Sequence, residues 1–304
     1  MDKIKKDLLL AVADLHQVPA GAYNIRENGQ GVEKKSTANI DIVPKKDKNG
    51  IDIIVKPNTQ NESIHIPVII TKSGVKDLVY NDFYIGDNAD VLIVAGCGIH
   101  NPEDSSSEHN GVHNFHLGKN ARVRYVEKHI GVGQKGDKIL NPITNIEMED
   151  NAYFEMETTQ LGGVTSSVRD SSAVLHTNSK LIIKEKILTT DEQKAITKFN
   201  VKLLGEDSSC EVISRSVAKN NSFQDFKSTV IGENKSFGHV ECDAILMDNA
   251  KIVSTPEIVA NCIDATLVHE AAIGKIAGDQ LIKLMTLGLS EQEAEDLIIK
   301  GFLS

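Results

Sequence analysis

Cysteine and histidine side chains that could bind a metal ion are concentrated between residues 96 and 116. The run Gly96-Cys97-Gly98-Ile99-His100 is followed by three more histidines in a stretch rich in glycine and serine. Thiolates and imidazoles are suitable ligands for zinc, iron or copper. If this stretch is helical, His113 and His116 share one face. The spacing reproduces no known four-ligand site, so a histidine-rich surface loop without metal stays open as the alternative. The candidate metal ligands are Cys97, His100, His109 and His113.

A resemblance to a known protein family, carried by four segments near the C-terminus, implies a second set of candidate ligands. Cys242, His269 and Glu270 offer a thiolate, an imidazole and a carboxylate, which are suitable ligands for iron. If the segment around residue 269 is a strand, the adjacent His269 and Glu270 should point to opposite faces. The competing interpretation is that Cys242 is a small core residue, because free cysteines are commonly buried.

The chain has four cysteines and no C-x₂-C pair. Compact carriers close an iron–sulfur cluster with several nearby cysteines, so we do not expect a permanently held cluster. Incomplete or mixed ligation would suit a cluster that must leave again. Cys210 and Cys262 are either further ligands or structural residues, since both lie among apolar or small residues. Nothing in the chain indicates secretion, so we expect reduced thiols.

Charge and motifs disfavour several classes of function. The formal net charge is −10 and no basic run is present, which makes nucleic acid and anionic membranes poor partners. Gly131-Val132-Gly133-Gln134-Lys135-Gly136 matches a dinucleotide pattern, but no helix is predicted after it, and the P-loop motif is absent. Any ATP hydrolysis must therefore come from a partner.

The elements that position these residues form a loose repeat. From about Gly86 onward, Asn or Asp followed by a small residue marks a turn before each strand-like run, at intervals of 27 to 32 residues. This pattern predicts a β-solenoid with strands between about residues 50 and 275. The 27 residues between Cys242 and His269 equal about one coil, which would stack them as neighbours. The turns used for the spacing are at Asn88, Asn120, Asn151, Asn178 and Ser208.

Both ends of the chain differ from the repeat. Ile4, Leu8, Val12 and Leu15 form one stripe of an amphipathic helix. Near the C-terminus, residues 279–286 are helix-like, and Ser290 to Glu293 form a capping box for a last helix. The last helix caps the final coil or docks a partner. The apolar stripe of this helix is the candidate partner-binding set. It consists of Ala294, Leu297, Ile298 and Phe302.

Four segments in one order resemble the C-terminal core of the SufB/SufD scaffold family of iron–sulfur cluster assembly. They are the segments at residues 238–247, 266–271, 276–281 and 288–294. The resemblance is strongest from Gly238 to Leu303 and weaker back to about Gly86. Cys242 matches the cysteine proposed to hold the cluster, and His269 with Glu270 match the last two residues of a Glu-His-Glu motif whose first position is Val268 here.

The resemblance implies a right-handed parallel β-helix, a small N-terminal α/β region and C-terminal helices. We expect an N-terminal region over residues 1–85, a β-helix core over 86–275 and a helical segment over 276–304. The implied function is a cytoplasmic scaffold, not an enzyme, that binds a transient iron–sulfur cluster, with iron or zinc as further candidate metals. Its implied partners are a SufC-type ATPase and a second copy or a SufB/SufD-like chain. Alternatives are a metal-dependent enzyme using the Cys97/histidine segment and a structural β-helix that binds protein or carbohydrate.

Overall fold

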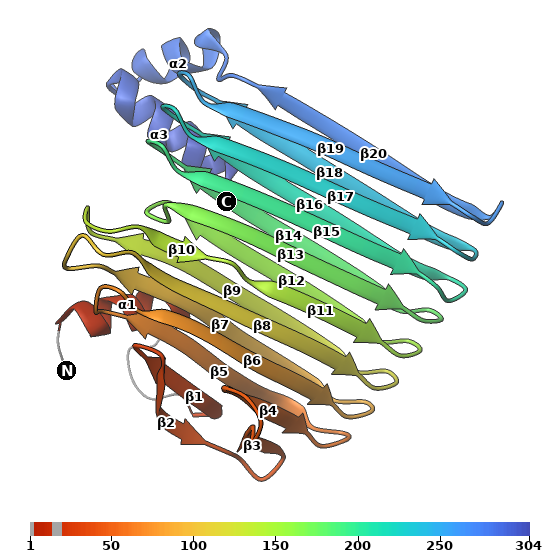
Figure 1. The fold of residues 1–304 in the computed structure, drawn as a ribbon. Coiled ribbons are helices and arrows are strands. Elements are labelled where there is room, and N and C mark those ends of the chain that lie inside the picture. Colours follow the sequence, from red (N-terminus) through yellow and green to blue (C-terminus); the bar gives the residue numbers. More distant parts are fainter. Residues whose placement is uncertain (1–2, 14–19) are drawn as a thin grey trace.

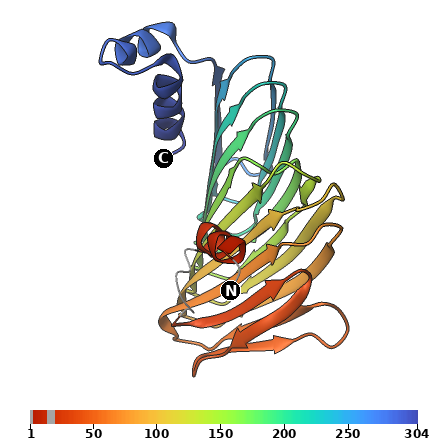
Figure 2. The ribbon, with the colours of Figure 1, turned by 90° about the vertical axis from the view of Figure 1, so that its left-hand side faces the viewer.

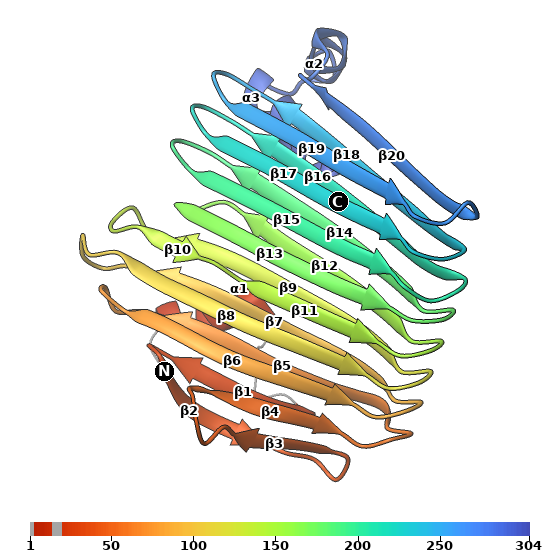
Figure 3. The same cartoon turned by 45° about the vertical axis from the view of Figure 1, so that its right-hand side comes forward.

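The chain folds into a parallel β-solenoid of about 8 turns whose coils stack along one axis (Figure 1). The computed structural model describes residues 3–13 and 20–304. Within them, two ten-stranded sheets, here called A and B, form the two walls of the solenoid (Figure 3). The predicted fold class and strand range are confirmed, because the stacked strands from β4 to β20 begin at Gly50 and end at Gly274.

The strands follow one another across each sheet in spatial order. Sheet A contains β2 (Gln30–Lys35), β1 (Ala22–Glu27), β5 (Gln60–Ile70), β7 (Asp90–His100), β9 (Arg122–Val132), β12 (Tyr153–Leu161), β14 (Lys180–Thr189), β16 (Ser208–Ala218), β18 (Ser236–Leu246) and β20 (Ala265–Gly274). Sheet B contains β19 (Lys251–Ala260), β17 (Phe223–Gly232), β15 (Lys194–Leu203), β13 (Ser166–Leu175), β10 (Lys138–Leu140), β8 (Ser107–Leu117), β6 (Lys76–Ile85), β4 (Gly50–Val55) and β3 (Ile40–Pro44). β11 (Ile143–Met148) continues after β10 between β8 and β13.

The strands form because apolar and polar residues alternate along them. β13 and β14 alternate strictly between buried and partly exposed residues, as expected when one face of a strand is turned into a core. The buried side chains from successive coils pack into one apolar cluster that extends from Ala22 on β1 to Cys242 on β18. Inward-facing side chains are therefore mostly apolar, and a polar side chain at such a position needs a hydrogen-bond or ion-pair partner.

The predicted turn asparagines make the corners of the coils. Asn88, Asn120, Asn151 and Asn178 have φ values of 58°, 58°, 61° and 56°, the left-handed region that asparagine enters more readily than most residues. The corners also bond along the stack, as the Asn120 side-chain amide donates to Asn88 Oδ1 at 3.0 Å. The repeat seen in the sequence is thus a repeat of one corner conformation.

The two ends of the solenoid differ. At the N-terminal end, β1–β2 and β3–β4 are antiparallel hairpins, while β1 and β4 pair in parallel with β5 and β6. The stack therefore begins before Gly86, and the expected division at residues 85 and 86 falls inside it. At the C-terminal end, β19 and β20 are the outermost strands of their sheets among the residues described.

Helix α1 (Lys3–Ala13) lies across the outer face of sheet A over β5, β7 and β9 (Figure 2). Leu8 and Val12 of the predicted stripe are buried, whereas Ile4 is 37% exposed and Leu15 lies outside the described residues. Gly96 and Gly98 on β7 leave room for this contact. An added methyl group at Gly96 would stand 2.7 Å from the Val12 carbonyl oxygen.

The C-terminal helices α2 (Gly278–Met285) and α3 (Glu291–Phe302) follow β20 and extend beside the solenoid (Figure 2). The predicted capping box is present, since the Ser290 hydroxyl accepts from the Glu293 amide and the Glu293 carboxylate accepts from the Ser290 amide. Ile299 and Leu303 pack on Val217 of β16. Helix α3 is therefore fixed to the outer face of sheet A near the last coils.

Candidate functional site

Cys242 lies in β18 with its side chain turned into the solenoid. Only 1% of the residue is exposed, and it belongs to the apolar cluster of the interior. Burial raises the pKa of its thiol, while a hydrogen bond with the hydroxyl of Ser254 on β19 opposes the rise. Cys242 is therefore a protonated thiol at neutral pH in this arrangement, and metal ligation there requires loss of that proton.

His269 and Glu270 lie on β20, the last strand of sheet A. Cys242 is in register with Ala271, which is two residues beyond His269. His269 therefore points inward, like Cys242, and is offset from it by two residues along the neighbouring strand. Glu270 points outward, where its carboxylate lies 3.8 Å from His239 Nε2. The expected opposite orientation of His269 and Glu270 is confirmed. The structure brings Cys242 and His269 to the interior and leaves Glu270 outside.

The last coil leaves this site close to an open end of the solenoid. Ile258 on β19 and Ile273 on β20 continue inward-facing rows, yet they are 45% and 44% exposed. His269 Nε2 is buried and lacks a hydrogen-bond partner. Burial also lowers the pKa of His269, and the charge of His239 adds to this effect. A neutral imidazole with a free nitrogen is a competent metal ligand.

The two other candidate cysteines in this half of the chain lie apart from Cys242. Cys210 is buried on β16 in register with Gly238, and burial raises the pKa of its thiol to about 12. Cys262 lies in the turn between β19 and β20 and is partly exposed. Neither is in register with Cys242, so their use as ligands stays a prediction.

A row of polar side chains leads through the interior to Cys242. Glu127, Thr158, Glu185, Ser214 and Cys242 are in register on five successive strands of sheet A, from β9 to β18. Neighbouring strands lie about 4.8 Å apart, and the Ser214 hydroxyl donates to Glu185 at 2.9 Å. Cys242 thus lies at the end of a row of polar side chains that runs beside the apolar core.

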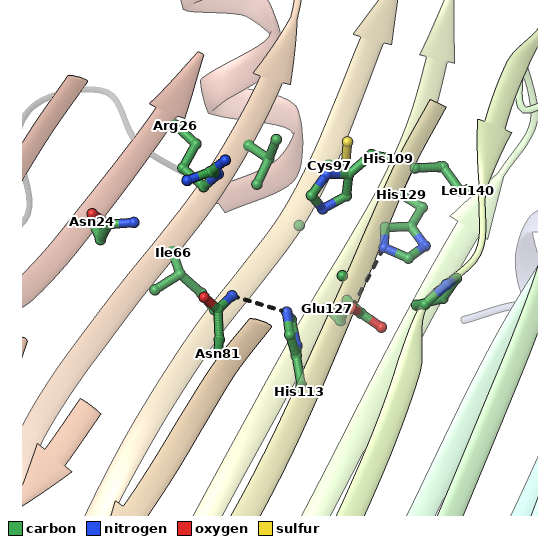
Figure 4. Close-up of a pocket in the computed structure, with 14 residues that line it drawn as sticks. Asn24, Arg26, Ile66, Asn81, Cys97, His109, His113, Glu127, His129 and Leu140 are labelled. Carbon is green, nitrogen blue, oxygen red and sulfur yellow. Dashed lines mark hydrogen bonds and ion pairs between the residues drawn. The ribbon is translucent and has the colours of Figure 1, made fainter. Parts of the chain in front are cut away.

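At the other end of this row lies a small interior cavity (Figure 4). It is lined by Cys97, His109, His113, Glu127 and His129 among others, and its volume of about 20 Å³ is enough for one water-sized molecule. Gly111 separates His109 from His113 on β8. An added methyl group there would stand 3.4 and 3.2 Å from their Nε2 atoms. The missing side chain of Gly111 therefore leaves room beside both imidazoles.

The expectation that the histidines occupy a flexible or helical loop is wrong. Cys97 and His100 lie in β7, and His109, His113 and His116 lie in β8. Alternation along β8 turns His109 and His113 inward but His116 outward, where it stacks on a tyrosine ring. A pair spaced i, i+3 shares a face in a helix but not in a strand, which is why the helical interpretation fails. His100, at the end of β7, does not line the cavity.

An ion pair and a tyrosine hydroxyl position two of the imidazoles beside the cavity. Asp77 accepts from Arg26 at 2.8 Å and lies 3.0 Å from His109 Nδ1. Although burial opposes it, His109 and Arg26 together lower the pKa of Asp77 to about 2. His113 Nδ1 lies 2.8 Å from the Tyr125 hydroxyl. Burial lowers the pKa of His113 to about 4, so it is neutral at pH 7.

A second buried ion pair continues from the cavity toward Cys242. Arg169 Nη1 lies 2.6 Å from Glu127 Oε2, and Arg169 Nε lies 3.9 Å from Glu185 Oε1. Burial alone would raise the pKa of Glu127, but Arg169 outweighs it and holds that pKa well below the usual range. Burial raises the pKa of Glu185. One guanidinium is thus shared between two buried carboxylates.

Sequence reasoning missed these buried charges. Glu127, Arg169 and Glu185 occupy inward positions of alternating strands, and a charge at such a position is the signal that could have identified them. Within residues 3–13 and 20–304, no three His, Cys, Asp or Glu side chains are arranged to hold a metal ion. The thiol of Cys97 is also fully buried, which raises its pKa well above the usual value.

The predicted partner-binding residues of α3 have different environments. Ala294 is fully buried, and Phe302 packs against the cluster formed by Ile299 and Leu303. Ile298 is partly buried, while Leu297 is 50% exposed. Part of the stripe therefore packs on the solenoid, and the rest, which includes Leu297, lies on the free face of α3.

No helix among the described residues is both long and apolar enough to cross a membrane. Residues 77–302 match the family model described as SUF system FeS cluster assembly, SufBD core domain. An iron–sulfur cluster assembly SufBD family protein of Methanocaldococcus jannaschii is 28% identical over 251 residues, covering 79% of this chain and 76% of that protein.

Two further archaeal relatives carry the same family description. The Archaeoglobus fulgidus protein is 28% identical over 280 residues, covering 84% of this chain and 69% of its own length. The Methanothermobacter thermautotrophicus protein is 29% identical over 233 residues, covering 76% of this chain but only 56% of its own length.

Proposed function

Because the chain belongs to the SufBD family of iron–sulfur cluster assembly proteins, we propose that it is a scaffold on which a nascent cluster, its cargo, is held near Cys242. One observation supports this site most directly. The Cys242 thiol and the unpartnered Nε2 of His269 lie on the last two strands of sheet A, next to the open end of the solenoid. Glu270 would join them only by a change at the end of β20. The chain acts in the cytoplasm and performs no turnover of its own.

A second copy would complete the ligand set. One chain offers one thiol and one imidazole at this place, whereas clusters generally bind four ligands. The outermost strands β19 and β20 carry exposed inward-facing residues such as Ile258 and Ile273. Pairing of these strands with those of another copy would cover that surface and bring a second Cys242 and His269 nearby.

The cluster site is tested by reconstitution with iron and sulfide under anaerobic conditions. We expect visible absorption of a cluster in the wild-type protein and its loss in Cys242→Ser. Cys97→Ser is the matched control, because it removes an equally buried thiol far from the last coil. A cluster that persists in Cys242→Ser, or is lost equally in both variants, would contradict the proposed site.

The proposed partner is a SufC-type ATPase, because the chain has no nucleotide motif of its own. The free face of α3 is its proposed contact. We expect Leu297→Asp with Ile298→Asp to abolish co-purification with the ATPase while the β-sheet circular dichroism stays unchanged. Lys300→Asp on the same helix gives the same change of charge and should retain binding. ATPase binding that survives the double substitution would rule out this contact.

A further inference from the structure

Glu185 is a buried carboxylate whose charge is in excess inside the solenoid. The residue faces inward on β14 and is 2% exposed. The guanidinium beside it belongs to Arg169, whose Nη1 lies 2.6 Å from Glu127 Oε2 but whose Nε lies 3.9 Å from Glu185 Oε1. Because Glu127 already neutralises Arg169, one negative charge remains on Glu185. A buried charge without a close partner is costly, so this carboxylate is not explained by ion pairing alone.

The other groups around Glu185 are neutral. Its register neighbours on sheet A are Thr158 of β12 and Ser214 of β16. From sheet B, β13 presents Arg169 and β15 presents Thr197. Within the part of the chain that the structure describes, Arg169 is thus the charged side chain that acts most directly on this carboxylate.

Hydrogen bonds indicate that Glu185 is ionised. The Thr197 hydroxyl donates to Oε1 at 2.9 Å, and the Ser214 hydroxyl donates to Oε2 at 2.9 Å. A protonated carboxyl group would itself donate through one oxygen, so two accepting oxygens are typical of the carboxylate. Burial nevertheless raises the pKa of Glu185, although Arg169 and both hydroxyls oppose the rise. Glu185 is therefore a stronger base than an exposed glutamate.

Ser214 connects this base with Cys242. It is in register with Glu185 on one neighbouring strand and with Cys242 on the other. Neighbouring strands lie about 4.8 Å apart, and side chains in register face the same way. Since the hydroxyl proton of Ser214 is directed at Glu185, its oxygen lone pairs are available to the thiol proton. One hydroxyl thus separates the thiol from a carboxylate.

The Cys242 thiol must lose its proton when it binds a metal ion. On the opposite wall, Ser254 contacts the thiol, but within the described residues it has no carboxylate partner. Release of the proton to solvent would add a second uncompensated charge to the interior. Transfer to Glu185 moves the existing charge to the sulfur and adds none, which avoids that cost.

We propose that Glu185 accepts the Cys242 proton through Ser214 as a metal ion of the nascent cluster binds the sulfur, an inference that rests on the proposed function. The S–H bond breaks and its proton passes to the Ser214 oxygen, while the Ser214 hydroxyl proton passes to Glu185 Oε2. The electron pair left on sulfur forms the bond to the metal. No oxidant or reductant is needed, and Glu185 ends as a neutral carboxylic acid.

The experiment measures the rate of anaerobic reconstitution of the full-length protein with ferrous iron and sulfide at several pH values. At about pH 7, we expect Glu185→Gln and Ser214→Ala to form as much cluster as the wild type, but at least about tenfold more slowly. Their rates should rise toward the wild-type rate at higher pH, because hydroxide then removes the thiol proton. Ser216→Ala is the matched control, since Ser216 is also buried and inward-facing on β16 but is in register with Ala244. It should load at the wild-type rate.

Infrared difference spectra give a second readout that a structural role would not change. Loading of the wild-type protein should produce the C=O stretch of a protonated carboxylic acid, and Glu185→Gln should lack this band.

Several outcomes would overturn the proposal. They are equal rates for the wild type and Glu185→Gln, a slow rate that does not change with pH, equal slowing in Ser216→Ala, or a carboxylic acid band that persists in Glu185→Gln. Each of these leaves the Cys242 site intact. A wild-type protein that forms no cluster would instead refute the Cys242 site, and this inference with it.

Discussion

Burial governs the acid–base behaviour of the residues that the sequence identifies as chemically capable. Cys97, Cys210 and Cys242 are buried, and burial raises the pKa of all three thiols. The thiolate is the nucleophile and the metal ligand, so these side chains are unreactive in the closed solenoid. The cysteine that the family resemblance selects is thus a buried, protonated thiol in this structure.

This protection predicts an order of reactivity toward iodoacetamide at neutral pH. Cys262, the one partly exposed cysteine among the described residues, should be alkylated first. Cys97, Cys210 and Cys242 should react at least about tenfold faster in denaturant than in the folded protein. Mass spectrometry of each peptide measures the four rates. Alkylation of Cys242 ahead of Cys262 in the folded protein would contradict this account.

Two interior groups make stability depend on pH below neutrality. His113 has a folded pKa of about 4, below its unfolded value of about 6.5, so the unfolded chain binds the proton more tightly. Stability should fall by about 3 kcal/mol as pH drops from about 6.5 to about 4. Asp77, with a folded pKa of about 2, stabilises the folded state above about pH 4 and loses that contribution at lower pH.

The measurement is urea unfolding at a series of pH values. Replacing His113 by Gln should reduce the slope between pH 6.5 and 4, because a glutamine takes up no proton; the buried His129, whose pKa burial also lowers, keeps part of the slope. The exposed His116 is the control, and its replacement by Gln should leave the slope unchanged. An unaltered slope in the His113 variant would rule out this residue as the source.

At the scale of elements, the corners and the ends of the chain could be predicted from the sequence. Asn88 and Asn120 mark corners because the left-handed conformation favours asparagine, and Ser290 with Glu293 mark the start of α3 because capping is local chemistry. The strand conformation of the segment from Cys97 to His116 was not predicted. Glycine and histidine are poor local strand signals, and pairing with neighbouring coils decides their conformation.

Helix α1 depends on a glycine in the strand beneath it. A methyl group at Gly96 would stand 2.5 Å from the Lys128 carbonyl oxygen and 2.7 Å from that of Val12. Neither backbone atom can move aside freely, so Gly96→Ala should destabilise the protein by about 1–3 kcal/mol. Gly31→Ala is the control, because no atom lies within 4 Å of its added methyl group. Equal melting temperatures for the two variants would contradict the proposed packing of α1.

At the scale of the whole molecule, the solenoid architecture follows from the repeat, whereas the interior charges do not. The spacing of turns predicts stacked coils without any knowledge of contacts. Whether Glu127 meets Arg169 depends on how β9 of sheet A faces β13 of sheet B across the interior, although the two residues are 42 positions apart in the chain. Such a pairing has no local signature. The same holds for the two-residue offset in register between Cys242 and His269, which the 27-residue spacing did not reveal.

The proposed association of two copies can be measured directly. Ile258→Asp with Ile273→Asp places charges in the exposed inner rows of β19 and β20. We expect a dimer for the wild-type protein and a monomer for this variant by light scattering after size exclusion. Val32→Asp at the opposite end is the matched control and should remain dimeric. A monomeric wild-type protein at high concentration would refute the association.

The unlike ends of the solenoid limit how large an assembly can become. At the end formed by β19 and β20, the outermost strand of each sheet runs parallel to its neighbour. At the other end of the described chain, the outermost strands β2 and β3 run antiparallel to β1 and β4. If two copies join through the same face around a two-fold axis, the contact is isologous. It then covers β19 and β20 of both copies. The product then has a reversed hairpin at both extremities, so growth stops at two chains instead of extending into a fibre.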